Sequence, residues 1–348
     1  MLSIVTSGLN AAQKDLSITA NNLANAGTTG FKRSEATFLD LYSNDPTADP
    51  RTLIGGGTQL GEIDRSTSQG PMKSTGNVTD LAISGRGFFT LARDDGSLIY
   101  TRAGNFTVRA DGAIVDAQNN FLQVFNLDST GKPLVDQDTT FAIVPAEKSP
   151  GLAKFSLLDA NGALRDDVPA GANVTFMVDG AQVGAPYSIT AADRLTGFVT
   201  LTSDQLNSGV ASKIRAVIGG SGQEITGEYQ KVFVQGLEIG TKGLINANFS
   251  DGSKTAIGSL AIATFAYEPG LRPIGDTNFA QSVESGDPIM TEAGAPAAGD
   301  IRSGMLEESN VDMTAELMQM LKAQQVYNGN ARMMQTSVEM ISRIVDHI

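Results

Sequence analysis

The sequence predicts an α+β protein that is mainly β, with a helix at each end of the chain, a β-rich middle and a small β domain inserted into that middle. Apolar residues recur every seven positions near both termini, and they alternate with polar residues between about 78 and 268. The composition also shifts twice inside the middle region. A seven-residue period is typical of helices packed along one another, whereas a two-residue period is typical of strands.

The N-terminal helix is expected within residues 1–30. Its apolar residues occupy two heptad positions: Leu2, Leu9, Leu16 and Leu23 at one, and Val5 and Ala12 at the other. Gly27 and Gly30 predict the end of the helix and a turn.

The C-terminal helix is expected within residues 311–348. One apolar line consists of Met313, Met320, Tyr327, Met334, Ile341 and Ile348, and the companion line of Leu317, Gln324, Ala331, Val338 and Val345. Asp312 is the predicted N-cap, with Glu316 in the first turn. Gly329 interrupts the pattern at a cost of about 1 kcal/mol relative to Ala, so it marks either a kink or a close helix contact.

The region between the helices reads as short strands and tight turns. Five turn signals are present: Asp95-Gly96, Asp111-Gly112, Asn161-Gly162, Asp179-Gly180 and Asp251-Gly252. Composition shifts after Pro145 and near 211–223 predict an inserted outer β domain at 148–225. The β-rich middle domain is then expected at 71–147 plus 226–310, and residues 31–70 as an extended connector.

Composition excludes several classes of function. The chain has 348 residues, a net charge of −13, no cysteine, and a single histidine at position 347. Nucleic-acid binding needs a surplus of Lys and Arg, and thiol catalysis or a Cys-based zinc site needs cysteine. One histidine argues against a Ser-His-Asp triad or a His-rich metal site. We therefore expect no enzyme activity, no cofactor, no metal site and no nucleic-acid partner.

Neither a membrane span nor a cleaved signal peptide is predicted. The longest apolar stretch, LAIATFA at 260–266, is too short to cross a bilayer. The N-terminus lacks the basic region, apolar core and cleavage site of a secretory signal. We expect no membrane insertion.

The terminal helices can be completed in two ways. A helix of about 25 residues rich in Ser, Thr and Asn is marginal alone in water. The helices could pair with each other or lie on the β region. Alternatively, other copies of the chain complete their apolar seams.

Four segments resemble the flagellar rod and hook protein family. They are SGLNAAQKDLSITANNLANAGTTGFKRSEATF (7–38), LAISGRGFFTL (81–91), YTRAGNFTVRADGAIVDAQNNFLQVF (100–125) and EESNVDMTAELMQMLKAQQVYNGNA (307–331), in the family's order. The family signature falls on Asn21, Asn22, Leu23, Ala24, Asn25, Gly30, Phe31 and Lys32. Two features favour a hook subunit: the stretch 243–271 and the insert at 148–225. The longer connector after Phe38 is typical of rod subunits, so a distal rod subunit is the alternative.

The resemblance implies a structural subunit that polymerises into a helical tube. The two terminal helices would pair as a coiled coil lining the inner tube, and the hook would act as a flexible joint carrying motor torque to the filament. The implied assembly interface consists of Leu2, Val5, Leu9, Ala12, Leu16, Leu23, Leu317, Met320, Tyr327, Met334, Val338, Ile341 and Val345. Implied partners are the chain itself, distal rod, hook cap and hook–filament junction proteins, and the flagellar export apparatus. The implied location is extracellular, in the hook, after type III export without a cleaved signal.

Other functions fit the sequence less well. Asp94-Asp95 and Asp166-Asp167 could form acid/base or calcium pairs, but both adjoin turn-like segments and are expected to be solvated turns. Gly55-Gly56-Gly57 is not a phosphate loop, because no Lys-Ser or Lys-Thr follows at the required spacing. A β-rich adhesin or carbohydrate-binding protein is the better rival, yet it has no need of heptads at both termini.

Overall fold

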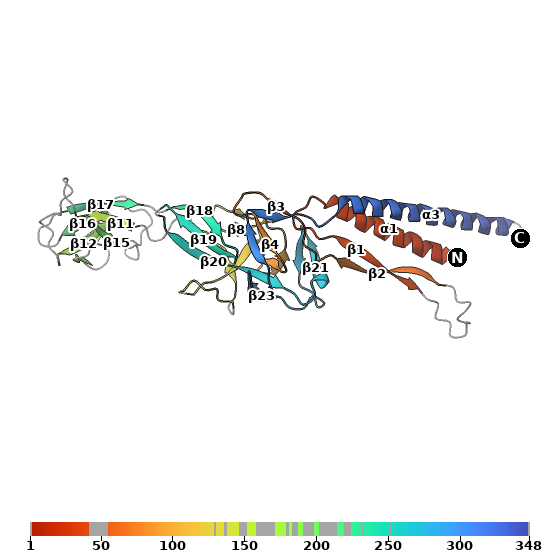
Figure 1. Ribbon diagram of the computed structural model, residues 1–348, viewed down its shortest axis with the longest axis horizontal. Coiled ribbons are helices and arrows are strands. Elements are labelled where there is room, and N and C mark those ends of the chain that lie inside the picture. Colours follow the sequence, from red (N-terminus) through yellow and green to blue (C-terminus); the bar gives the residue numbers. More distant parts are fainter. Residues whose placement is uncertain are drawn as a thin grey trace. The chain divides into compact units, whose positions relative to one another are not determined.

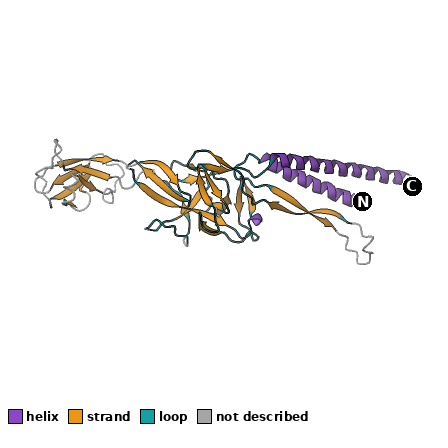
Figure 2. Ribbon diagram, in the orientation of Figure 1, coloured by secondary structure: helices purple, strands orange, loops and turns teal. Residues whose placement is uncertain are grey.

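The computed structural model describes residues 2–41, 55–128, 130–135, 138–145, 152–157, 171–178, 181–182, 187–190, 198–201, 214–218, 224–230, 233–250 and 252–346. The chain forms two compact units: Met1–Ile143, Ile239–Ile245 and Ala256–Ile348 make up the first, and Val144–Glu238 and Asn246–Thr255 the second. Strands predominate, and the two long helices both belong to the first unit (Figure 2). The mainly β composition with a helix near each end is confirmed.

The two helices are α1 (Leu2–Ala24) and α3 (Met313–Asp346). After α1, a turn is closed by the amide of Thr28, which donates to the Asn25 carbonyl at 3.1 Å. The predicted N-cap of α3 is confirmed, because Asp312 Oδ1 accepts from the amides of Thr314 at 2.8 Å and Ala315 at 3.2 Å. These interactions satisfy backbone groups that would otherwise lack partners at the helix ends.

A long two-stranded hairpin follows α1. Strands β1 (Ser34–Leu41) and β2 (Gly57–Arg65) are antiparallel, in a register running from Ser34 opposite Arg65 to Leu41 opposite Gly57. A bulge lies between Thr37 and Phe38. Both strands contact α1, and the hairpin lies beside the helices (Figure 1). The sequence predicted an extended segment here. The structure shows in addition that its two strands pair with each other.

The β body of the first unit contains one large sheet and two small ladders. Neighbouring strands of the large sheet are, in order, β20 (Lys254–Thr264), β9 (Phe121–Phe125), β5 (Phe88–Ala92), β6 (Leu98–Thr101), β22 (Asn278–Ala280) and β21 (Arg272–Gly275). At its margins lie β7 (Thr107–Val108), β8 (Ile114–Val115), β10 (Thr140–Phe141) and β23 (Ile289–Glu292). The two ladders pair β3 (Met72–Ser74) with β25 (Met305–Glu307), and β4 (Leu81–Ser84) with β24 (Asp300–Ser303). A short 3₁₀ helix, η2, spans Glu268–Gly270. The ladders attach the segment before α3 to the β body.

Aromatic residues fill the core of this sheet. The ring centroids of Phe88 and Phe265 lie 6.1 Å apart, those of Phe88 and Phe279 5.8 Å, and those of Tyr100 and Phe265 4.8 Å, all edge to face. The Tyr100 hydroxyl is buried and has no hydrogen-bond partner among the described residues. Burial raises the pKa of Tyr100 to about 12.

Two of the predicted tight turns are confirmed. Gly96 and Gly112 have φ of 80° and 84°, the left-handed conformation that such turns require. Asp95 Oδ1 accepts from the Ser97 amide at 2.8 Å, and Asp94 and Asp95 are both exposed, as expected of solvated turn residues. Asn161-Gly162, Asp166-Asp167, Asp179-Gly180 and Asp251 lie outside the described residues.

The second unit contains an antiparallel sheet of its own. Its strands follow the order β13 (Ala181–Gln182), β12 (Asn173–Val178), β16 (Ile214–Ile218), β17 (Glu224–Gln230), β11 (Leu152–Ser156) and β15 (Phe198–Leu201), and β14 (Tyr187–Ser188) pairs with β12. Strands β18 (Val234–Ile239) and β19 (Leu244–Phe249) follow in the chain. A domain boundary at 148 and 225 stays a prediction.

Candidate assembly interface

The two terminal helices lie side by side (Figure 1). On α1 the buried residues are Val5, Ala12 and Thr19, seven apart, and Asn22. On α3 the buried residues are Glu316 and Ala323. The helices approach so closely that a Cβ added at Gly8 would lie 2.9 Å from Asn330 Nδ2. A seven-residue spacing of buried residues keeps one face of a helix against its neighbour.

The predicted interface residues fall into three groups. Val5 and Ala12 are buried in the single chain. Half-buried are Leu2, Leu9, Leu16, Leu23, Met320, Tyr327 and Met334. About half exposed are Leu317, Val338 and Ile341. Val345 belongs to α3, but its side chain is outside the described part.

The face of α3 that contacts α1 is not the one predicted for the companion line that begins at Leu317. Met320, Tyr327 and Met334 alternate along it with Glu316, Ala323 and Asn330, which are buried or half-buried. The companion residues Leu317 and Val338 lie off this face. Apolar periodicity did not predict that the polar residues Glu316 and Asn330 lie on this face.

A polar junction joins α1 and α3 to the start of β1. Asn22 Nδ2 donates to the Ser34 carbonyl at 2.7 Å and to Glu316 Oε2 at 3.3 Å, while the Ser34 amide donates to Asn22 Oδ1 at 2.9 Å. Arg33 Nε forms an ion pair with Glu316 Oε1. The Arg33 amide donates to Asn310 Oδ1 at 2.7 Å. Two regions far apart in the sequence, 22–34 and 310–316, therefore meet at Asn22 and Glu316.

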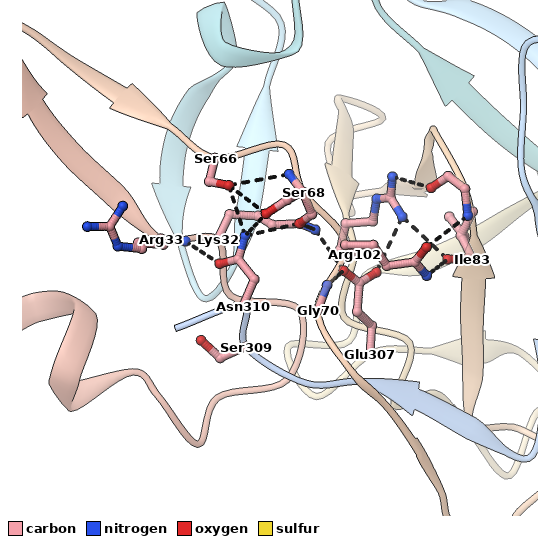
Figure 3. A network of polar contacts seen from close by, with 12 residues as sticks. Lys32, Arg33, Ser66, Ser68, Gly70, Ile83, Arg102, Glu307, Ser309 and Asn310 are labelled. Carbon is pink, nitrogen blue, oxygen red and sulfur yellow. Dashed lines mark hydrogen bonds and ion pairs between the residues drawn. The ribbon is translucent and has the colours of Figure 1, made fainter. Parts of the chain in front are cut away.

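A second junction buries three charged side chains (Figure 3). Glu307 Oε1 accepts from Lys32 Nζ at 2.7 Å, and Glu307 Oε2 from Arg102 Nη1 at 3.3 Å. The side chains of Lys32, Glu307 and Arg102 are only 5%, 1% and 3% exposed. Burial lowers the pKa of Lys32 and of Arg102, and Glu307 opposes both shifts. Glu307 is therefore the acceptor that keeps both buried cations paired.

Backbone groups complete the second junction. The Gly70 amide donates to Glu307 Oε1 at 3.0 Å, and Lys32 Nζ also donates to the Ser68 carbonyl at 2.8 Å. Arg102 Nη2 donates to the Gly85 carbonyl at 2.8 Å. In Figure 3 the side chains converge from the segments after α1, after β2, after β6 and from β25. We call Lys32, Gly70, Arg102 and Glu307 the charged clamp.

The signature residues have different positions at these junctions. Asn22, Gly30 and Lys32 are buried, Leu23, Asn25 and Phe31 are half-buried, and Asn21 and Ala24 are exposed. Gly30 has φ of +70°, and a Cβ there would lie 2.4 Å from the Ala103 amide nitrogen. Any other residue would be strained and would clash with the β body.

Sequence reasoning missed Arg102, Glu307 and Glu316 as joining residues. Their partners lie up to 294 positions away in the chain, as for Asn22 and Glu316. A charged residue next to an apolar strand carries no mark of its distant partner. The available signal was that Arg102 lies in the family-like segment 100–125, and Glu307 and Glu316 in the segment 307–331.

The pocket between the terminal helices and β1 is lined by both apolar and polar side chains. Its volume is about 410 Å³, and its lining includes Ala11, Ile18, Phe38 and Val326, together with Glu316 and Arg33, which already pair with each other. Among the described residues, no three or more His, Cys, Asp or Glu side chains gather to hold a metal ion. No helix in the described part of the chain is long and apolar enough to span a membrane.

Three family models match the chain. "Flagella basal body rod protein" matches residues 2–32, "Flagellar hook protein FlgE/F/G D1 domain" residues 82–148, and "Flagellar basal body rod FlgEFG protein C-terminal" residues 302–346. The matched segments include α1, much of the large sheet, Glu307 and α3.

Relatives align over nearly the whole chain. The flagellar hook protein FlgE of Salmonella typhimurium is 26% identical over 407 residues, covering 99% of each chain. FlgE of Brucella abortus is 27% identical over 400 residues, covering 99% of this chain and 98% of the relative. The flagellar basal-body rod protein FlgG of Agrobacterium fabrum is 28% identical over 353 residues, covering 98% and 96%. The chain belongs to the bacterial flagellar hook and basal-body rod protein family.

Proposed function

We propose that this chain is the structural subunit of a flagellar hook, which assembles with copies of itself into a helical tube. The observation that carries the proposal is the alignment with hook proteins along 99% of the chain, which includes both helical ends. The large apolar residues that α3 leaves exposed support self-assembly, because monomeric soluble proteins seldom expose many of them along one element.

The division of the chain into helices and β units suggests how the tube would work. Paired terminal helices would line the inner tube as a coiled coil and give it torsional stiffness. The β units would lie outside, where polar contacts could slip as the joint bends. A subunit of this kind needs neither catalysis nor a cofactor.

The expected neighbours follow from the hook assignment. They are the distal rod at one end, the cap during growth, and the hook–filament junction proteins at the other. We propose export through the flagellar export apparatus without a cleaved signal, to an extracellular location. A chain without cysteine can be threaded unfolded with no risk of a premature disulfide.

A distal rod subunit is the second candidate. The alignment with the rod protein of Agrobacterium fabrum spans 353 positions, close to the 348 residues of this chain, whereas the alignment with the Salmonella hook protein spans 407 and so contains many more gaps. Length therefore favours the rod, and the additional strand-rich unit favours the hook.

Imaging of basal bodies from a strain that lacks this gene separates the candidates. Complete rods and rings with no curved tube beyond the outer surface are expected for a hook subunit. Truncated rods that never cross the envelope would identify a rod subunit. Intact flagella bearing filaments would refute both assignments.

Point variants test the role of the helices. Leu16→Asp or Ile341→Asp should abolish tube formation while the β sheet stays folded, because each places a charge in an apolar contact. Gln325→Asp, at an exposed position of α3, is the matched control and should assemble. Normal tubes from both aspartate variants would contradict the helical interface.

A further inference from the structure

Three sides of α3 differ in what covers them. The side facing α1 carries the buried Glu316 and Ala323 and the half-buried Met320, Tyr327 and Met334. Two other sides carry large apolar residues that are about half exposed in the single chain. A helix in a single soluble domain usually has one apolar face, so the two uncovered sides need an explanation.

The first uncovered strip lies near the start of α3. We define strip A as Met313, Leu317 and Leu321, which are four residues apart and therefore on one side of the helix. They are 57%, 48% and 60% exposed. Strip A is thus a short row of branched or flexible apolar side chains about 90° around the helix axis from the side that faces α1.

The second uncovered strip lies further along α3. We define strip B as Gly329, Met333 and Met340, spaced by four and seven residues. Met333 is 57% exposed and Met340 is 54% exposed. With about 100° of rotation per residue, strips A and B lie about 140° apart around the helix axis.

Gly329 makes no close side-chain contact with the described part of its own chain. A Cβ added there would meet no atom within 4 Å, and α3 continues without interruption from Met313 to Asp346. The residue is therefore neither a contact with α1 nor the end of a helix. Within the monomer it only destabilises the helix, by about 1 kcal/mol relative to Ala. Its effect on the surface is a gap in strip B, one turn before Met333.

We propose that strip B receives strip A of a second copy of this chain, with Leu317 of the second copy seated over Gly329. This inference rests on the proposed function, since it names the contact between copies in the tube. Both strips belong to the same helix and face nearly opposite ways, so one copy can contact two neighbours. Such a head-to-tail contact repeats without closing and builds a tube.

The pairing sets the offset between neighbouring copies. Copies related by helical symmetry have parallel α3 helices. Leu317 over Gly329 and Leu321 beside Met333 both require a shift of 12 residues, or about 18 Å along the helix. The missing side chain at position 329 lets the two helices approach closely, and Leu317 fills the gap.

Disulfide trapping tests the pairing directly, because the chain has no cysteine of its own. In the full chain carrying Leu321→Cys and Met333→Cys, mild oxidation of tubes should give a ladder of linked subunits. The two sites are about 18 Å apart on one helix, too far for a bridge within a chain. The matched control carries Leu321→Cys and Arg332→Cys, one position away and outside strip B, and should give no ladder.

The outcomes separate this inference from the proposed function. Normal tubes without a ladder, or an equal ladder from the control pair, would overturn the strip pairing while leaving the hook assignment intact. Failure of the unmodified chain to form any tube or to restore hooks in a deletion strain would overturn the function itself.

A second measurement uses Gly329 alone. Gly329→Leu should keep or increase the helix content of the monomer by circular dichroism, since the side chain meets nothing there. The concentration needed for tube formation should rise about tenfold or more, because the gap is filled. Gln325→Leu adds the same side chain one turn away and should assemble normally. Equal assembly of the two variants would refute the role of the gap.

Discussion

Replacing Glu307 by Gln tests the charged clamp most directly. The substitution preserves size and removes the negative charge that Lys32 and Arg102 share, with Nζ at 2.7 Å and Nη1 at 3.3 Å. All three side chains are at least 95% buried, so water cannot replace the lost partner. The variant leaves two buried cations with a neutral acceptor between them.

The expected loss follows from that burial. Removing one partner of a buried ion pair typically costs about 3–5 kcal/mol. Gln retains one acceptor for Lys32 Nζ or the Gly70 amide, so we expect the lower part of this range, about 3 kcal/mol. For a unit of this size that corresponds to a decrease in melting temperature of about 6–12 °C.

Urea and thermal unfolding of the full chain, followed by near-ultraviolet circular dichroism of the aromatic core, measure this loss. Glu308→Gln is the matched control: the neighbouring carboxylate is about half exposed and pairs with exposed Lys73 at 3.4 Å. Its cost should be below about 1 kcal/mol. Equal stability of the two variants would refute the assignment of Glu307 as the acceptor for both cations.

Three further predictions concern Gly30, Tyr100 and the chain ends. Gly30→Ala should destabilise by about 2 kcal/mol or more in urea unfolding, because of its φ of +70° and the Cβ clash at 2.4 Å, whereas Gly27→Ala, with nothing within 4 Å, should change little. Tyr100→Phe should be neutral or stabilising by about 1 kcal/mol, because it removes a buried hydroxyl that has no hydrogen-bond partner in the part of the chain that the structure describes. Burial raises the pKa of Tyr100 to about 12, so the folded state favours the neutral phenol. The free energy of unfolding of the unmodified chain therefore falls as the pH rises from about 10 through 12. Thermal unfolding measured from pH 8 to 12 should show a smaller fall for Tyr100→Phe. A less stable variant would mean that the hydroxyl has a partner. Limited proteolysis should cleave both ends in the monomer and spare them in tubes; equal resistance in the two states would contradict ordering upon assembly.

The sequence alone determined the features that depend on neighbouring residues. Heptads predicted a helix near each end, Asp312 its N-cap, and Asp-Gly pairs the turns at Gly96 and Gly112. Helix periodicity, capping and tight turns are local, so a stretch of a few residues carries the whole signal.

Only the tertiary structure decided which distant residues meet. Glu307 pairs with Lys32 across 275 positions, and Glu316 with Asn22 across 294. It also decided which face of α3 contacts α1, since polar Glu316 lies on that face and apolar Leu317 does not. Burial and charge pairing depend on how the segments pack in space, and spacing along one chain does not record that packing.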